Sequence, residues 1–195
     1  MNKLAILSLL ILPLAACMNL GASTQVVNFY VLASPPETVR PASNLKGPYV
    51  GVMPVNLPAY LQRPQLVLRA GNNVDISIED YHRWGEDLAL GIARVVSQGM
   101  TNELTSIGGS ASPLRAGNPV DLRIRLDMHR FDGAPDEQVT LEALWILQRD
   151  GKNIKDGSYS ASIIAGPEIT DLVLAQSEML YKLSEELSNA VRSAW

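Results

Sequence analysis

The chain has 195 residues, with 16 Lys and Arg against 20 Asp and Glu, which gives a formal net charge of -4 at pH 7. Nucleic-acid-binding proteins cluster lysine and arginine against the phosphates, so this acidic balance argues against that class. Cys17 is the single cysteine, which excludes an internal disulfide and a multi-cysteine metal site. The length suits one domain with a substantial core.

The first 16 residues have the pattern of a lipoprotein signal peptide. A lysine at position 3 precedes an apolar stretch over 4–12, which is shorter than the roughly 20 residues that cross a bilayer. The cleavage motif, or lipobox, is Leu14, Ala15, Ala16 and Cys17. A cysteine thiol can take a diacylglyceryl group, and several acyl chains hold a protein stably at a membrane. We therefore expect a signal peptide over 1–16, a lipidated N-terminus and tether over 17–26, and a folded domain over 27–195.

Two points qualify this N-terminal prediction. The alternative is an ordinary cleaved signal peptide in which Cys17 is incidental. The residue after the cysteine carries sorting information in lipoproteins of double-membraned bacteria, where an aspartate favours retention in the inner membrane. This residue is Met18, so we expect the protein to be anchored at the periplasmic face of the outer membrane.

The first half of the domain alternates strand-forming segments with proline. Residues 27–33 and 49–55 are rich in β-branched and aromatic side chains and predict two strands. Residues 65–69 and 74–78 flank a Gly-Asn-Asn sequence and predict a hairpin.

Residues 84–104 change to helical spacing. Their apolar side chains recur on one stripe, and the run ends before Gly108 and Gly109, which predicts an amphipathic helix facing the core. The loop over 106–110 resembles a helix C-cap rather than a phosphate-binding loop, since it follows a helix and has no lysine.

Three further strands and a second helix complete the domain. Strict alternation over 120–129, an apolar run over 139–148 and a strand over 158–165, with an Asp-Gly turn at 150–151, predict an antiparallel meander. Thr170 is the expected cap of a last helix that continues to the end of the chain. The predicted fold class is α/β (α+β): a mixed, largely antiparallel sheet with two long amphipathic helices packed on it, in a single domain.

Side chains able to do catalysis are scarce. His82 and His129 have no second histidine at ligand spacing, and the sequence contains no GxSxG, HExxH or GxGxxG motif. The carboxylate pairs at 79–80 and 86–87 could do acid–base chemistry, but acidic residues at a helix entry are favoured by the helix dipole in any case. We predict no catalytic residues, no metal site and no cofactor.

The segment over 56–65 is the strongest candidate for a partner contact. Prolines stiffen it, and a stiff segment loses less entropy on docking. Tyrosine and arginine, which are common at binding hot spots, lie between the prolines. The candidate contact residues are Pro58, Tyr60, Leu61, Arg63 and Pro64. The alternative is a structural crossover in which Arg63 pairs with a local carboxylate, and the sequence leaves the two open.

Several segments together resemble a known family. They are the lipobox, Phe29-Tyr30-Val31-Leu32, the run over 50–55, the Leu-Pro-Ala-Tyr-Leu-Gln-Arg-Pro-Gln stretch over 57–65, and Arg-Trp-Gly-Glu-Asp-Leu over 83–88. The chain resembles the ABC-type transport auxiliary lipoproteins, and among them those that partner MCE-domain systems. Many members have an aspartate where Gln62 stands, which weakens any role assigned to that position.

The resemblance implies a role in lipid traffic between the inner and outer membranes that supports envelope integrity, as a docking component rather than an enzyme. It implies two partners, an MCE-domain protein that spans the periplasm and its inner-membrane partner, and it makes a ring-shaped homo-oligomer plausible. The alternative is a lipoprotein that itself binds a lipid or small ligand in the periplasm.

Overall fold

The structure is a computed structural model that describes residues 25–35, 46–71 and 74–195. A three-stranded sheet has the order β1-β4-β3 and a five-stranded sheet has the order β5-β2-β6-β7-β8. The strands are β1 (Asn28–Tyr30), β2 (Tyr49–Val52), β3 (Gln65–Leu68), β4 (Ser77–Trp84), β5 (Ser110–Pro113), β6 (Leu122–Asp132), β7 (Gln138–Arg149) and β8 (Lys152–Ile164). The helices are α1 (Leu88–Leu104) and α2 (Ile169–Ala194), with single 3-10 turns at η1 (Ala59–Leu61) and η2 (Thr105–Ile107).

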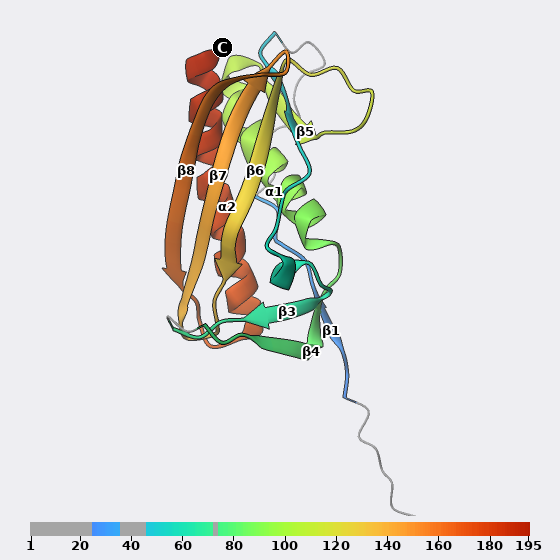
Figure 1. Ribbon diagram of the computed structural model, residues 1–195, viewed down its shortest axis with the longest axis vertical. Coiled ribbons are helices and arrows are strands. Elements are labelled where there is room, and N and C mark those ends of the chain that lie inside the picture. The colour runs from blue at the N-terminus through green and yellow to red at the C-terminus, as the bar shows by residue number, and fades with distance from the viewer. Residues whose placement is uncertain (1–24, 36–45, 72–73) are drawn as a thin grey trace, which may run out of the picture.

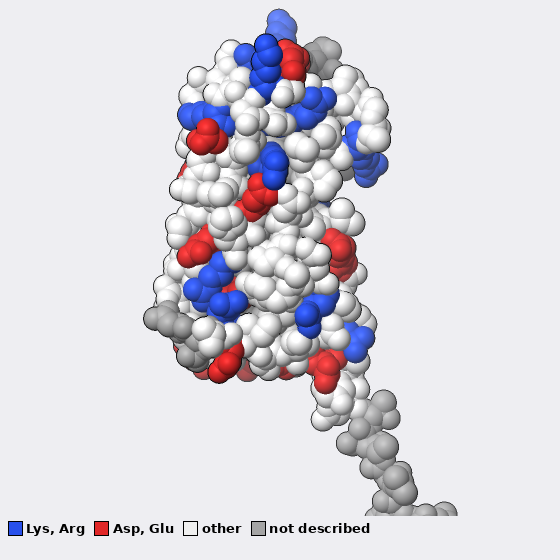
Figure 2. Space-filling view, viewed as in Figure 1, with Lys and Arg blue, Asp and Glu red and all other residues white. Residues whose placement is uncertain are grey.

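The two long helices cover one face of the larger sheet, and the small sheet lies across its lower end (Figure 1). The predicted fold class is confirmed, with the strands divided between two sheets. Pairing is antiparallel between β3 and β4 and through the meander β6-β7-β8, whereas β2 runs parallel to both β5 and β6. On the face shown in Figure 2, side chains of both charges are interspersed.

The meander has the strongest sequence pattern in the chain and the most regular structure. β6 alternates between buried and more exposed side chains, because one of its faces meets the helices. Asp150 and Gly151 form the turn from β7 to β8 with φ angles of 49° and 76°. Two successive positive φ angles match the right-handed twist of the strands, which is why this dipeptide favours a tight hairpin.

The core lies between the larger sheet and the helices. Fully buried side chains come from β6 and β7 on one side and from the two helices on the other, among them Leu126, Leu141, Met100 and Leu183. Each such side chain stabilises the fold by about 1.5–3 kcal/mol relative to its exposed state. Where the helices cross, a Cβ on Gly99 would lie 2.6 Å from Ser184 Oγ, so glycine permits their close approach.

Two predicted helix starts are wrong. The first helix begins at Leu88, because Trp84 ends β4 and the Asp87 carboxylate caps α1 by accepting a hydrogen bond from Leu90 N at 3.1 Å. The second helix is capped by Glu168 and not by Thr170, since Glu168 and Asp171 each bond the other's backbone N–H in a capping box. The loop predicted over 106–110 also contains the start of β5, which pairs with β2.

The N-terminal predictions fall mostly outside the described residues. The lipobox, Cys17 and the tether up to residue 24 are not among them. Within the described ranges, no helix is both long and apolar enough to cross a membrane.

Candidate functional site

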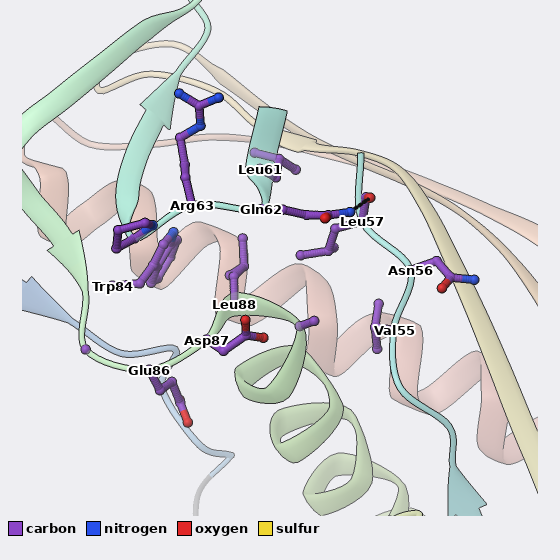
Figure 3. A pocket seen from close by; sticks show the side chains of 13 residues that line it. Val55, Asn56, Leu57, Leu61, Gln62, Arg63, Trp84, Glu86, Asp87 and Leu88 are labelled. Carbon is purple, nitrogen blue, oxygen red and sulfur yellow. Dashed lines mark hydrogen bonds between the residues drawn. The ribbon is translucent and has the colours of Figure 1, made fainter. Parts of the chain in front are cut away.

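A pocket of about 740 Å³ lies where the segment around η1 meets the turn from β4 into α1 (Figure 3). One part of its lining comes from residues 55–57 and 61–64, and the other comes from residues 84–89. Both stretches overlap segments by which the sequence resembles the transport auxiliary lipoproteins, 57–65 and 83–88. Residues 65–83 separate the two stretches in the chain, and the fold brings the stretches together.

The first wall of the pocket is a proline-stiffened crossover. Pro58, with φ -54° and ψ 143°, precedes the single turn of η1, and its carbonyl accepts a hydrogen bond from Leu61 N at 2.9 Å. Pro64 restricts the residue before it to extended conformations, so the turn cannot continue as a helix. The Gln62 side-chain amide donates to Leu57 O at 2.6 Å and closes the segment on itself. This wall is therefore held by local bonds.

The second wall is the strand-to-helix turn. Trp84 N donates to Pro64 O at 2.7 Å, a backbone bond that ties the two walls together. Asp87 caps α1, and Glu86 forms an ion pair of 2.5 Å with Arg94 in the second turn of that helix. Both acidic residues of this turn therefore have structural partners, as the helix-entry interpretation predicted.

The pocket has apolar sides and a charged rim. Its buried apolar side chains are Val55, Leu57, Leu61, Trp84 and Leu88. Figure 3 shows the Asp87 carboxylate inside the ring of lining side chains, whereas the Glu86 carboxylate and the Arg63 guanidinium point away from it. Such a mixture of apolar surface and few polar groups is typical of a binding pocket.

Arg63 has no partner in the part of the chain that the structure describes. Its side chain is half-buried, yet Nε is inaccessible to solvent and makes no hydrogen bond with any described residue. None of the ion pairs within the described ranges involves it. The local carboxylate of the alternative interpretation is therefore not found among these residues.

Tyr60 lies behind the pocket wall and fixes it to the larger sheet. Its hydroxyl donates to Asp132 Oδ2 at 2.5 Å, and the Asp132 side chain is fully buried at the end of β6. Arg130 Nε donates to Asp132 Oδ1 at 2.8 Å, and Arg69 Nε lies 3.3 Å from Oδ2 in an ion pair without hydrogen-bond alignment. Burial, and then the bond to Asp132, raise the pKa of Tyr60 well above its ordinary value.

The predicted contact residues are thus divided between two roles. Leu61, Arg63 and Pro64 line the pocket, Pro58 starts η1, and Tyr60 anchors it. Asp132 was not among the predicted site residues, because an aspartate that ends a strand before a glycine carries no distinctive pattern in the sequence.

The histidines lie elsewhere. The Tyr30 hydroxyl and His82 Nδ1 are hydrogen-bonded at 2.8 Å, and His129 is exposed on β6. Neither residue lines the pocket. Across the described ranges, no group of three or more His, Cys, Asp or Glu side chains could hold a metal ion.

The fold is also found in solved structures of other proteins. The crystal structure of an uncharacterized protein is 16% identical with a TM-score of 0.69, covering 85% of this chain and 99% of that one. A DUF330 protein from Xanthomonas campestris is 12% identical with a TM-score of 0.66, covering 86% of this chain and 97% of its own. At these identities the likeness shows the fold alone.

Sequence comparison gives the family. No curated protein matches the chain. The family described as ABC-type transport auxiliary lipoprotein component matches residues 30–188, which include both pocket walls, the two sheets from Tyr30 onward and most of α2. The chain therefore belongs to the ABC-type transport auxiliary lipoprotein components, as its motifs predicted.

Proposed function

We propose that the chain is a membrane-anchored, non-enzymatic subunit of an MCE-type intermembrane lipid transport system. It docks the periplasm-spanning MCE protein at the outer membrane and so supports envelope integrity. The observation that carries this proposal is the pocket itself, because two stretches that resemble the transport auxiliary lipoproteins form its opposite walls. Stiff backbone, apolar sides and an arginine at the rim are features of a docking surface.

The chemistry of the pocket favours docking over catalysis. Its lining contains no histidine, cysteine or serine, and its two carboxylates cap α1 and pair with Arg94. Covalent or acid–base catalysis needs a nucleophile and a base within hydrogen-bond reach of each other. The pocket offers no such pair.

The anchor belongs to the same proposal. With Cys17 lipidated, the chain from Cys17 to the start of β1 at Asn28 spans at most about 40 Å. The domain would then stay close to the membrane surface, where a component that crosses the periplasm must arrive. Copies of the domain could surround that component, since a repeated heterologous contact closes into a ring.

A lipid-binding role is the second candidate, and the apolar sides of the pocket support it. Native mass spectrometry of the purified full-length protein separates the two functions. Phospholipid bound in a fixed ratio favours the lipid carrier, and protein free of lipid favours docking.

Fractionation of cells tests the docking function directly. Membranes are separated on a sucrose gradient from wild-type cells, from cells lacking this gene and from cells carrying Cys17→Ser. We expect the MCE protein to leave the outer-membrane fraction in the deletion strain and in the Cys17→Ser strain, where the domain is folded but unanchored. Unchanged association of the MCE protein with the outer membrane in the deletion strain would contradict the proposal.

A further inference from the structure

We propose that Arg63 and the pocket beside it recognise an acidic–apolar peptide segment: a carboxylate binds the guanidinium and a neighbouring apolar side chain enters the pocket. The inference rests on the proposed docking function and adds the chemistry of the docked segment. Its starting point is Arg63, whose Nε makes no hydrogen bond and whose side chain makes no ion pair among the described residues.

Arg63 contrasts with three arginines that pair with carboxylates. Arg69, Arg94 and Arg130 each lie within 3.3 Å of a carboxylate oxygen. Arg63 has no such partner among the described residues, although its Nε is sealed from water. Because none of the ion pairs within the described ranges involves Arg63, the Nη donors of its guanidinium remain for the carboxylate of a partner.

The backbone holds Arg63 in place for such a contact. Arg63 N donates to Leu61 O at 2.9 Å, and Pro64 on its other side is tied to Trp84. Little conformational freedom is lost when a residue fixed in this way binds. A guanidinium presents a planar fork of donors that matches a carboxylate in two parallel hydrogen bonds.

The surrounding charges favour an anion on the Arg63 side. Arg69 and Arg130 share the single carboxylate of Asp132, which also binds Tyr60, three residues before Arg63, so this cluster has an excess of one positive charge. Basic side chains gather over the lower end of β6 in Figure 2. At the opposite wall the Asp87 carboxylate repels a second anion and can accept a hydrogen bond from a peptide N–H or a cation. The site therefore has a polarity, with its acid-binding end at Arg63.

The size of the pocket suits the apolar part of a peptide segment. A volume of about 740 Å³ lies in the range of pockets that hold drug-sized ligands. Apolar peptide side chains of ordinary size fit within this volume against Leu57, Leu61 and Leu88. A phosphate headgroup could satisfy Arg63, so the experiment includes a lipid arm.

The test uses a random dodecapeptide phage library selected on the full-length protein. Parallel selections use Arg63→Gln, Arg63→Lys and the control Arg115→Gln, an exposed arginine in the loop after β5. We expect selected peptides to carry Asp or Glu within three residues of Leu, Ile, Phe or Trp. A labelled selected peptide should bind Arg63→Gln at least about tenfold more weakly in fluorescence anisotropy, and Arg115→Gln unchanged. Arg63→Lys should also bind more weakly, because lysine lacks the fork.

Three results would overturn the inference. They are selection of no peptide, selection of peptides without an acidic residue, and equal binding to wild type and Arg63→Gln. Retention of phosphatidylethanolamine or phosphatidylglycerol in native mass spectra of the wild type, lost in Arg63→Gln, would assign the site to a headgroup instead. Circular dichroism confirms that each variant is folded.

Cell fractionation of Arg63→Gln distinguishes this inference from the docking function. If the peptide results are negative while the MCE protein stays at the outer membrane, the recognition chemistry is wrong and docking stands. If the MCE protein does not depend on this lipoprotein at all, the docking function itself is wrong.

Discussion

The hydroxyl of Tyr60 donates a hydrogen bond of 2.5 Å to the fully buried carboxylate of Asp132, which lies 72 residues further along the chain. The bond fixes the 3-10 turn η1, and with it one wall of the pocket, to the end of β6. Arg69 and Arg130 hold the same carboxylate from two further sides. The shape of the pocket therefore depends on a contact outside its lining, and this dependence can be tested without touching the lining.

Tyr60→Phe removes this hydrogen bond and keeps the ring. We expect unfolding to become easier by about 1–3 kcal/mol, because the lost bond served a charged, buried acceptor. Urea denaturation measures the change. Tyr49→Phe is the matched control, since the Tyr49 hydroxyl bonds a neutral partner, Ser112 Oγ, at 2.7 Å. A larger loss in Tyr49→Phe than in Tyr60→Phe would contradict the anchoring role.

Asp132→Asn tests the charge at the centre of the cluster. Two half-buried arginines would lose their counter-charge, and removing one member of a buried pair costs roughly 3–5 kcal/mol. Glu178→Gln is the control, because the Glu178–Lys182 pair of 2.8 Å lies at the surface, where such pairs contribute about 0–1 kcal/mol. Thermal or urea unfolding of both variants gives the comparison. Equal, small effects would show that the cluster is dispensable.

Alkaline pH provides an independent test of the same contact. Burial and the bond to Asp132 raise the pKa of Tyr60 in the folded state above the value of about 10 for an unfolded chain. The stability from this group is complete below about pH 10. It is lost as pH rises further, because the unfolded state releases its proton first. The urea concentration at the unfolding midpoint is measured at pH 9, 10 and 11, and it should fall more steeply with pH for wild type than for Tyr60→Phe. An equal fall in both proteins would contradict the prediction.

The helix crossing predicts a further stability change. A methyl group added at Gly99 would meet both Oγ and Cβ of Ser184, at 2.6 Å and 2.7 Å. Gly99→Ala should therefore destabilise the fold by about 1–3 kcal/mol. Ser184→Gly in the same chain should restore part of this loss by removing the clash. A double-mutant cycle measured by thermal unfolding gives the coupling, and strict additivity of the two changes would mean that the residues do not meet.

Some of this architecture follows from local pattern and some does not. The meander and the last helix were predicted because each buries one face, so that apolar side chains recur at the period of a strand or helix. Trp84 was wrongly assigned to the first helix because its spacing from Leu88 fits the helical period. The same apolar residue is equally suited to the end of a strand, and Trp84 is in fact the last residue of β4. Thr170 was predicted as the cap because threonine is a preferred residue at helix N-termini. In the structure the helix is instead capped by Glu168, whose side chain and that of Asp171 each bond the other's backbone N–H.

The candidate site was predicted in its parts but not in its assembly. Arg63 and its proline neighbours stood out as a stiff, hot-spot-like segment, and the helix entry stood out separately. Their meeting depends on the backbone bond between Trp84 and Pro64 and on the bond from Tyr60 to Asp132, which joins residues 72 positions apart. Such long-range contacts leave no periodic signal in the sequence.

Photo-cross-linking in living cells tests most directly the claim that this pocket docks the MCE protein. Benzoylphenylalanine is placed at Gln62 and at Ala89, which line the pocket, and at Ile107, which is exposed beyond the other end of α1, about 25 Å away along the helix. We predict that positions 62 and 89 cross-link to the MCE-domain protein, that position 107 does not, and that Arg63→Gln reduces the cross-links at the first two. The contrary result is that neither position 62 nor position 89 cross-links to that protein, although both variants support envelope integrity. It would show that the pocket does not dock the MCE protein.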